Sequence, residues 1–325
     1  MSLIKKRGRE LFLMAIILLI GVIVSLRAPA FFSVINITSI LYGNAIIGIM
    51  AIGMMIVITT ANIDVSVGAQ FAVCNMICAA FVKATDGRYA AAAVLISMVI
   101  GMALGMFNGL LIAKLNIPAI VVTLGTMNIM RGGIYYLTNG NWIDGLSGPF
   151  TRLASSRVLL NVPMAVYIWL LVAVITYVVL YRTNMGRNIL AIGGNLVAAT
   201  RVGISKLRVY LFAFGYLGAL VGLGGAVSAA KLKIAQPSNG IGYEMDLIAA
   251  AIIGGTQFSG GVASILGTVL GVLLLGVIDN GLVLAKVPVY WQDLATGAII
   301  IIAVTTSALR EFAPARKKTR KEAVK

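Results

Sequence analysis

The sequence predicts an all-α membrane protein in which about ten transmembrane helices form two inverted five-helix repeats. Its 325 residues are 60% hydrophobic and only 11% charged, whereas soluble domains are about 25% charged. Continuous uncharged runs such as 11–26 and 165–181 approach the roughly 20 residues that cross a bilayer as a helix, and they lack the alternation of a barrel strand. The phrase NGLLIAK at 108–114 also returns as NGLVLAK at 280–286, with five of seven positions identical.

Ten apolar stretches are expected to cross the membrane. They are 11–26, 38–60, 65–82, 90–113, 118–137, 163–181, 209–230, 246–259, 262–284 and 289–308. Residues 11–308 therefore form one transmembrane domain, between a basic start at 1–10 and a basic tail at 309–325. The stretch 246–259 is short and glycine-bordered, so a broken or re-entrant helix is expected there.

The first stretch has a second interpretation as a cleaved signal peptide, because a basic start precedes it and small residues follow it. The apolar run 11–26 is slightly long for a signal core, and nine further spans follow. We therefore favour its retention as a membrane anchor.

Positive charge predicts the orientation. Residues 1–10 hold four Lys or Arg, 182–208 hold five and 310–325 hold seven. Such clusters mark the cytoplasmic side of a membrane, and ten spans place all three on that side, both termini included. The net charge of +16 is then an orientation signal. The tail is expected to touch anionic lipid, and no nucleic-acid partner is expected.

The repeated phrase closes the fourth and the ninth expected span, so its two copies run through the membrane in opposite directions. Two further pairs keep the same order: IDVSVGAQ (63–70) with MDLIAAAI (245–252), and IPAIVVTLGT (117–126) with VPVYWQDLATGA (287–298). Short Gly/Leu/Ala motifs also recur by chance in apolar sequence. Three matches in one order favour an inverted repeat, an arrangement that builds a transport path between its halves.

The chain is not expected to be an enzyme, and no cofactor or metal is predicted. It contains no His, and none of its ten acids lies at the centre of an expected span. Ion-coupled transporters usually carry such groups, although backbone carbonyls alone can bind sodium, so an ion-coupled secondary transporter of a small polar solute is the alternative. No GxxxxGK[ST] motif occurs, so ATP hydrolysis would need a separate subunit.

Polar residues in or beside the spans are candidates for a translocation path or gate. Asp64 stands just before the third span, where a carboxylate can cap a helix N-terminus. The alternative for the others is hydrogen bonding between helices. The candidate set is Asp64, Asn108, Thr126, Asn128, Gln257 and Asn280.

The loop 182–208 is the most informative polar segment. A short helix is expected near 196–202, between glycines at 193, 194 and 203. An Ala-rich helix with glycine-bounded ends suits insertion into a groove of a motor protein. The alternative is a loop that only its charges order.

The whole chain resembles the permease subunits of bacterial ATP-binding-cassette (ABC) importers for ribose, xylose and rhamnose. The stretches that carry the resemblance are NIDVSVG (62–68), IPAIVVTLGTMNIMRG (117–132), GRNILAIGGNLVAATRVGI (186–204), GYEMDLIAAAIIGGTQFSGG (242–261) and NGLVL (280–284). The resemblance implies an ABC ATPase subunit, a second permease (a copy of this chain or a different one) and a periplasmic substrate-binding protein as partners.

The resemblance also implies an ATPase-coupling role for one set of loop residues: Gly193, Gly194, Asn195, Ala198, Ala199 and Gly203. Within the family, NGNWIDGL (139–146) and PVYWQDLATGAIII (288–301) look most like permeases for autoinducer 2 and then rhamnose, with other pentoses or polyols as further substrates. Ala61 and Asn62 stand where many relatives carry glycine, which leaves the flexibility of a gate there in question.

The inverted repeat predicts opposite locations for Lys114 and Lys286. Single-cysteine variants, Lys114→Cys and Lys286→Cys, should be made in a background in which Ala replaces Cys74 and Cys78. A membrane-impermeant maleimide added to intact cells should label position 286 and not position 114. Labelling of both positions from the same side contradicts the repeat.

Overall fold

The computed structural model describes residues 3–157 and 161–288, with seven further positions between 290 and 305. Every named element of this part is helical. The long helices are α1 (Leu3–Arg27), α2 (Val34–Thr59), α3 (Val67–Ala84), α4 (Ala90–Leu115), α5 (Ala119–Thr138), α7 (Met164–Arg182), α10 (Lys206–Leu232) and α12 (Ile265–Leu284). The shorter ones are η1 (Pro29–Phe32), η2 (Pro149–Thr151), α6 (Arg152–Ser155), α8 (Asn184–Gly194), α9 (Leu196–Arg201) and α11 (Tyr243–Ile253).

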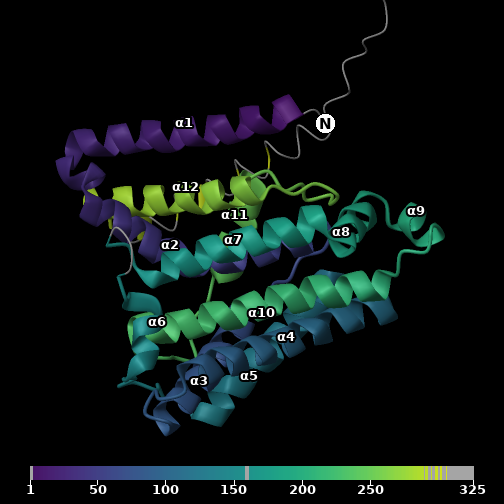
Figure 1. Ribbon diagram of the computed structural model, residues 1–325, viewed down its shortest axis with the longest axis horizontal. Coiled ribbons are helices and arrows are strands. Elements are labelled where there is room, and N and C mark those ends of the chain that lie inside the picture. Colours follow the sequence, from purple (N-terminus) through teal and green to yellow (C-terminus); the bar gives the residue numbers. More distant parts are fainter. Residues whose placement is uncertain are drawn as a thin grey trace, which may run out of the picture.

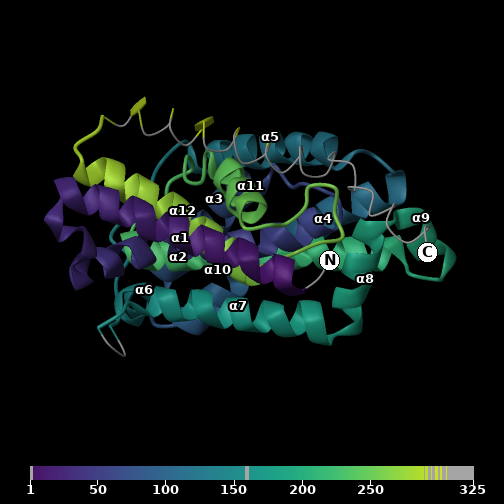
Figure 2. The same cartoon turned by 90° about the horizontal axis from the view of Figure 1, so that it is seen from above.

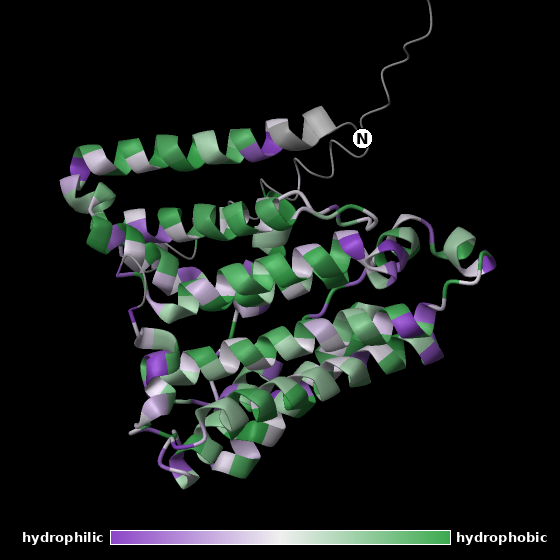
Figure 3. Cartoon of the chain, viewed as in Figure 1, coloured by the Kyte–Doolittle hydropathy of each residue, from purple (hydrophilic) through white to green (hydrophobic). Residues whose placement is uncertain are grey.

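Seven of the described helices are long and apolar enough to cross a membrane: α1, α2, α3, α4, α7, α10 and α12. Hydrophilic residues gather toward the two ends of these helices (Figure 3). α5 has 20 residues but falls outside this set, because polar residues such as Asn128 and Arg131 lower its hydropathy. α11 has only 11 residues, about half of a bilayer crossing.

Eight of the ten expected stretches coincide with helices along most of their length. The expected stretch 246–259, where a broken or re-entrant helix was expected, is helical only as far as Ile253. The helix stops there because Gly254 is followed by Gly255 at φ +107°, a conformation that favours glycine and cannot continue an α-helix. The expected stretch 289–308 lies almost wholly outside the described residues.

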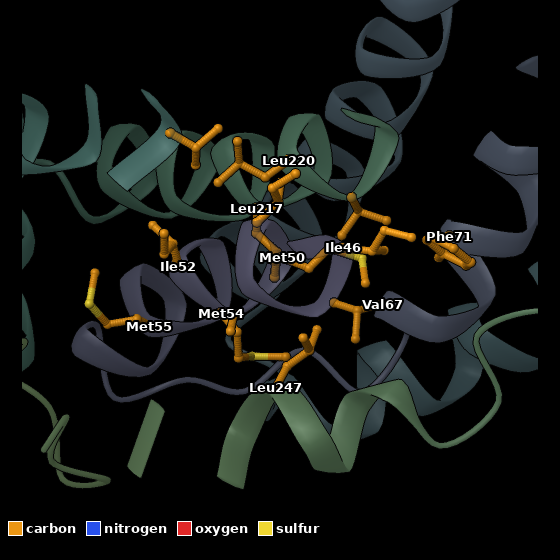
Figure 4. Packing of buried hydrophobic residues seen from close by; sticks show 14 of the residues in the cluster. Ile46, Met50, Ile52, Met54, Met55, Val67, Phe71, Leu217, Leu220 and Leu247 are labelled. Atoms are coloured by element: carbon orange, nitrogen blue, oxygen red, sulfur yellow. The ribbon is translucent and has the colours of Figure 1, made fainter. Parts of the chain in front are cut away.

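α2 is the central helix. Its residues from Ile49 to Ile58 are buried on every face, as is expected of a helix that is apolar all round. Met50 and Met54 lie between Leu217 of α10 on one side and Leu247 of α11 on the other (Figure 4). Flexible methionine side chains fill the irregular space where these helices cross.

α4 and α10 pack against each other along most of their length, antiparallel and with their backbones in contact. A Cβ atom on Gly101 would overlap the carbonyl oxygen of Gly218, and one on Gly105 would overlap that of Phe214. Glycines at such spacing let two membrane helices approach closely. The buried Ser97 hydroxyl of α4 donates to the Gly222 carbonyl across the same interface (2.7 Å).

The two ends of the bundle differ. α1 begins at the end that carries α8 and α9 (Figure 1), and it lies against α12 at the edge of the bundle in both views (Figures 1 and 2). At the start of α1, Arg9 Nη2 donates to the Ile252 carbonyl at the end of α11 (2.9 Å). Glu10 accepts from the Ser264 hydroxyl (2.9 Å). η1, α6 and the turn between α3 and α4 lie at the opposite end.

The close α4–α10 contact predicts that a larger side chain at this interface lowers the stability of the protein. Gly101→Val should lower stability by about 1–3 kcal/mol, the usual range for overpacking, because the backbones must separate. Gly133→Ala on α5 is the control, since its Cβ would meet nothing within 4 Å. The thermal midpoint of the detergent-purified protein measures the effect. An unchanged midpoint for Gly101→Val contradicts this account of the interface.

Candidate functional site

A fully buried polar cluster lies where the connection between α2 and α3 meets α4. Its members are Asp64, Ser66, Gln70 and Asn108, each with no exposed surface. Asp64 and Ser66 belong to the non-helical segment 60–66, Gln70 lies in the first turn of α3, and Asn108 comes from the last part of α4. The cluster therefore unites two residues of the sequence-predicted gate set, Asp64 and Asn108, with two that were not in it.

The Asp64 carboxylate is the shared acceptor of this cluster. Oδ1 accepts from the Ser66 backbone N–H (2.8 Å) and from the Ser66 hydroxyl. Oδ2 accepts from Gln70 Nε2 (3.2 Å) and Asn108 Nδ2 (3.3 Å). The two amide nitrogens also donate to Ser66 Oγ, at 2.8 and 2.9 Å. The N-cap residue of α3 is Ser66, so Asp64 binds the turn that precedes the helix and does not itself cap α3.

Burial raises the pKa of the Asp64 carboxyl above its ordinary value, and the hydrogen bonds from Ser66, Asn108 and Gln70 act in the opposite direction. The amide oxygens Gln70 Oε1 and Asn108 Oδ1 are buried without a hydrogen-bond partner. The cluster thus holds one carboxyl group, several hydrogen-bond donors and two amide oxygens without a partner.

A second polar contact region joins the start of α3 to the non-helical segment 233–242, which connects α10 to α11. Gly68 and Gly240 face each other so closely that a Cβ on either would collide with the backbone of the other. Asn239 Nδ2 donates to Asn75 Oδ1 (3.1 Å). Arg131 of α5 donates to the Asn239 carbonyl (3.0 Å) and to that of Pro237.

The remaining residues of the predicted gate set lie apart. Thr126 is buried on α5 and bonds to the Thr123 carbonyl of its own helix. Asn128 is exposed on α5, and Gln257 lies in the loop after α11. Asn280 of α12 exchanges two amide hydrogen bonds with Asn36 of α2, at 2.9 and 3.0 Å. The structure therefore does not bring these residues together into one site.

The predicted short helix in the loop 182–208 is α9, Leu196–Arg201. Side-chain caps define the arm formed by α8 and α9. Thr183 accepts from the Gly186 N–H at the start of α8, and Asn195 accepts from the Ala198 N–H (2.9 Å) at the start of α9. The arm extends past the ends of α7 and α10 (Figure 1).

The six arm residues expected to couple to an ATPase differ in their exposure. Gly193 and Ala199 are buried, whereas Gly194, Asn195, Ala198 and Gly203 are exposed. Val197 and Val202 are apolar yet 59% and 77% exposed. The tip of the arm therefore presents small and apolar groups to its surroundings.

Sequence reasoning missed Ser66, Gln70, Arg131 and Asn239. A signal existed for two of them. Gln70 stands four residues after Ser66, a spacing that places both on one helix face, and Arg131 is the single charged residue of the expected span 118–137. No local signal marks Asn239, because tertiary packing alone brings it to α3.

Comparisons with known proteins identify the family. The model of the family described as branched-chain amino acid transport system / permease component matches residues 36–304. The chain is 36% identical to the autoinducer 2 import system permease protein LsrC of Enterobacter sp. (strain 638) over 311 residues, 95% of this chain and 89% of that protein.

Ribose import permease proteins RbsC are equally similar. The Escherichia coli (strain K12) protein is 36% identical over 299 residues, 90% of this chain and 91% of its own length. The Bacillus subtilis (strain 168) protein is 40% identical over 284 residues, 87% of this chain and 88% of its own length. No solved structure matches the chain.

The chain therefore belongs to the branched-chain amino acid transport system / permease component family. It is a permease component of an ABC importer of the sugar type and a multi-pass protein of the bacterial inner membrane.

The Asp64 cluster predicts an order of stability for two substitutions. Asp64→Asn should cost less than about 1 kcal/mol, because one amide of Gln70 or Asn108 can turn and offer its spare oxygen. Asp64→Ala leaves several buried donors without an acceptor, at about 1–3 kcal/mol for each. Thermal midpoints of the purified variants give the order. A less stable Asp64→Asn than Asp64→Ala contradicts the assignment.

Proposed function

We propose that this permease moves a small neutral sugar-like molecule into the cell by alternating access. The first candidates are autoinducer 2 and a rhamnose-like deoxysugar, followed by pentoses such as ribose and by polyols. The names of the relatives support autoinducer 2 and ribose as substrate types. The uncharged amide and hydroxyl groups around Asp64 and Asn75 support a neutral, hydrogen-bonding substrate.

An inverted repeat is supported by how the helices pair. α10 packs against α3 and α4, and α2 packs in the same manner against α11 and α12. The two copies of the repeated phrase also lie at opposite ends of the bundle. Asn116, just after NGLLIAK, accepts from Lys206 beside the arm (2.6 Å). Asn280, within NGLVLAK, pairs with Asn36 next to η1.

The exposed face of α5 supports the proposal that a second permease binds this chain. Gly125, Asn128 and Gly132 lie on one stripe of this helix and are exposed. A Cβ on either glycine would meet nothing within 4 Å. An amide turned toward lipid is unfavourable, whereas small residues and an amide are usual where two membrane helices meet. We therefore place the second permease against α5.

The observation that carries the ATPase partnership is the projecting arm. Val197, Ala198 and Val202 are exposed at its tip, and Asn195 caps α9 as a preformed helix. A capped helix with a small apolar face fits a groove on another protein. ATP binding by an ABC ATPase subunit there would push the arm and rock the two halves. A periplasmic binding protein would deliver substrate at the opposite end.

The arm predicts a selective loss of coupling. Ala198→Glu puts a charge into the docking face and should abolish ATPase association and uptake of ribose or autoinducer 2. Its level in the membrane should stay normal, because Ala198 is exposed and supports no buried contact. Immunoblotting, co-purification and uptake in cells that express the whole import system measure the three quantities.

Gly8→Glu is the matched control, since it places the same charge on an open position at the same end of the bundle. Normal association and uptake in Ala198→Glu would refute the docking site.

A further inference from the structure

Three backbone segments from distant parts of the chain meet at the base of the arm. They are the end of α2 at Thr59, the end of α8 at Gly193, and Gly260 with Gly261 in the loop between α11 and α12. The Gly261 N–H donates to the Thr59 carbonyl (2.9 Å). These four residues form what we call the glycine junction.

The junction has no room for side chains. A Cβ on Gly193 would overlap the Thr59 carbonyl oxygen, and one on Gly260 would lie 2.7 Å from the Gly193 oxygen. A Cβ on Gly261 would lie 2.9 Å from the Cα of Gly194. Contacts between side chains can absorb a displacement by changing rotamers. Backbones in direct contact have no such freedom, so a displacement of one moves the others.

The loop 254–264 that enters the junction is itself firmly held. The Tyr181 hydroxyl at the end of α7 donates to the Ala263 carbonyl (3.0 Å). Arg9 and Glu10 of α1 bind the two ends of the loop, at Ile252 and Ser264. The loop therefore moves as part of its supporting helices.

Each segment of the junction continues toward the centre of the protein. From Thr59 the chain runs through the non-helical segment 60–66 to the Asp64 cluster and the start of α3. From Gly260 it runs back through Gly254 into α11. The far end of α11 follows Gly240, which is in contact with Gly68 of α3. Both routes thus end where α3 meets the segment 233–242.

We propose that the glycine junction is the element that transmits movement of the arm to both halves of the permease. This inference rests on the proposed function of α9 as the ATPase-docking helix. A displacement of α8 at Gly193 reaches α2 in the first half and the α11–α12 loop in the second half simultaneously. Gly193, Gly260 and Gly261 are accordingly positioning residues for transport, and they touch neither substrate nor ATP.

The test separates ATP hydrolysis from transport. Gly193→Ala should keep the ATPase subunit bound and hydrolysing ATP, while uptake of ribose or autoinducer 2 is lost, because the added methyl group overlaps the Thr59 carbonyl oxygen and separates the two backbones. Gly261→Ala should behave alike. Gly43→Ala in α2 is the matched control, since its Cβ meets nothing within 4 Å, and it should import normally.

The outcomes distinguish the proposed role of the glycine junction from the proposed docking of an ATPase subunit on α9. Normal uptake in Gly193→Ala with loss of uptake in Ala198→Glu overturns the junction and keeps the docking site. Normal uptake in both variants overturns both. Loss of ATPase binding in Gly193→Ala also overturns the junction, because the residue would then act in docking.

A second experiment needs no glycine variant, so it tests the proposal even if Gly193→Ala does not accumulate in the membrane. Spin labels at Arg187→Cys on α8 and Phe258→Cys in the loop, both exposed positions, report the distance across the junction in the full complex, with Cys74 and Cys78 replaced by Ala. The distance should stay the same with and without ATP. A change in this distance shows that the segments move separately and overturns the proposal.

Discussion

The structure depends on close backbone contact between helices, because the surrounding lipid supplies no hydrophobic driving force for helix association. Lipid tails are as apolar as leucine, so van der Waals packing and hydrogen bonds must hold the bundle together. At the α4–α10 interface, Gly101 and Gly105 bring the two backbones into contact. The same device recurs where Gly254 and Gly267 join α11 to α12.

Close packing also decides where polar groups can lie. Asn75 and Ser97 donate to carbonyls of Gly225 and Gly222 on α10, which are within reach because those glycines carry no side chain. The segments 60–66 and 233–242 are non-helical backbone inside a membrane protein. Such backbone is tolerated only where protein covers it or it lines a cavity, and here the two segments flank the start of α3.

Transport by alternating access needs rigid parts and a defined place where force enters. Small-residue interfaces supply the rigidity, because they leave few rotamers to change. The arm formed by α8 and α9 supplies a projection that the rest of the bundle does not cover. At its base the ends of α2 and α8 and the loop between α11 and α12 are in backbone contact. Packed backbone therefore connects the exposed tip of the arm, which we propose as the docking face, to the buried polar cluster around Asp64.

The sequence by itself determined the all-helical membrane class, eight of the expected helices and the short helix after Asn195. These follow from local physics: apolar length, glycine punctuation and side-chain caps act within a few residues. Tertiary structure alone decided that Asn108 joins Asp64 while Asn280 joins Asn36, although both belong to the same repeated phrase. It also decided that Gly193 meets Thr59. Partners that lie far apart in the chain are chosen by the packing of whole helices, which no local pattern records.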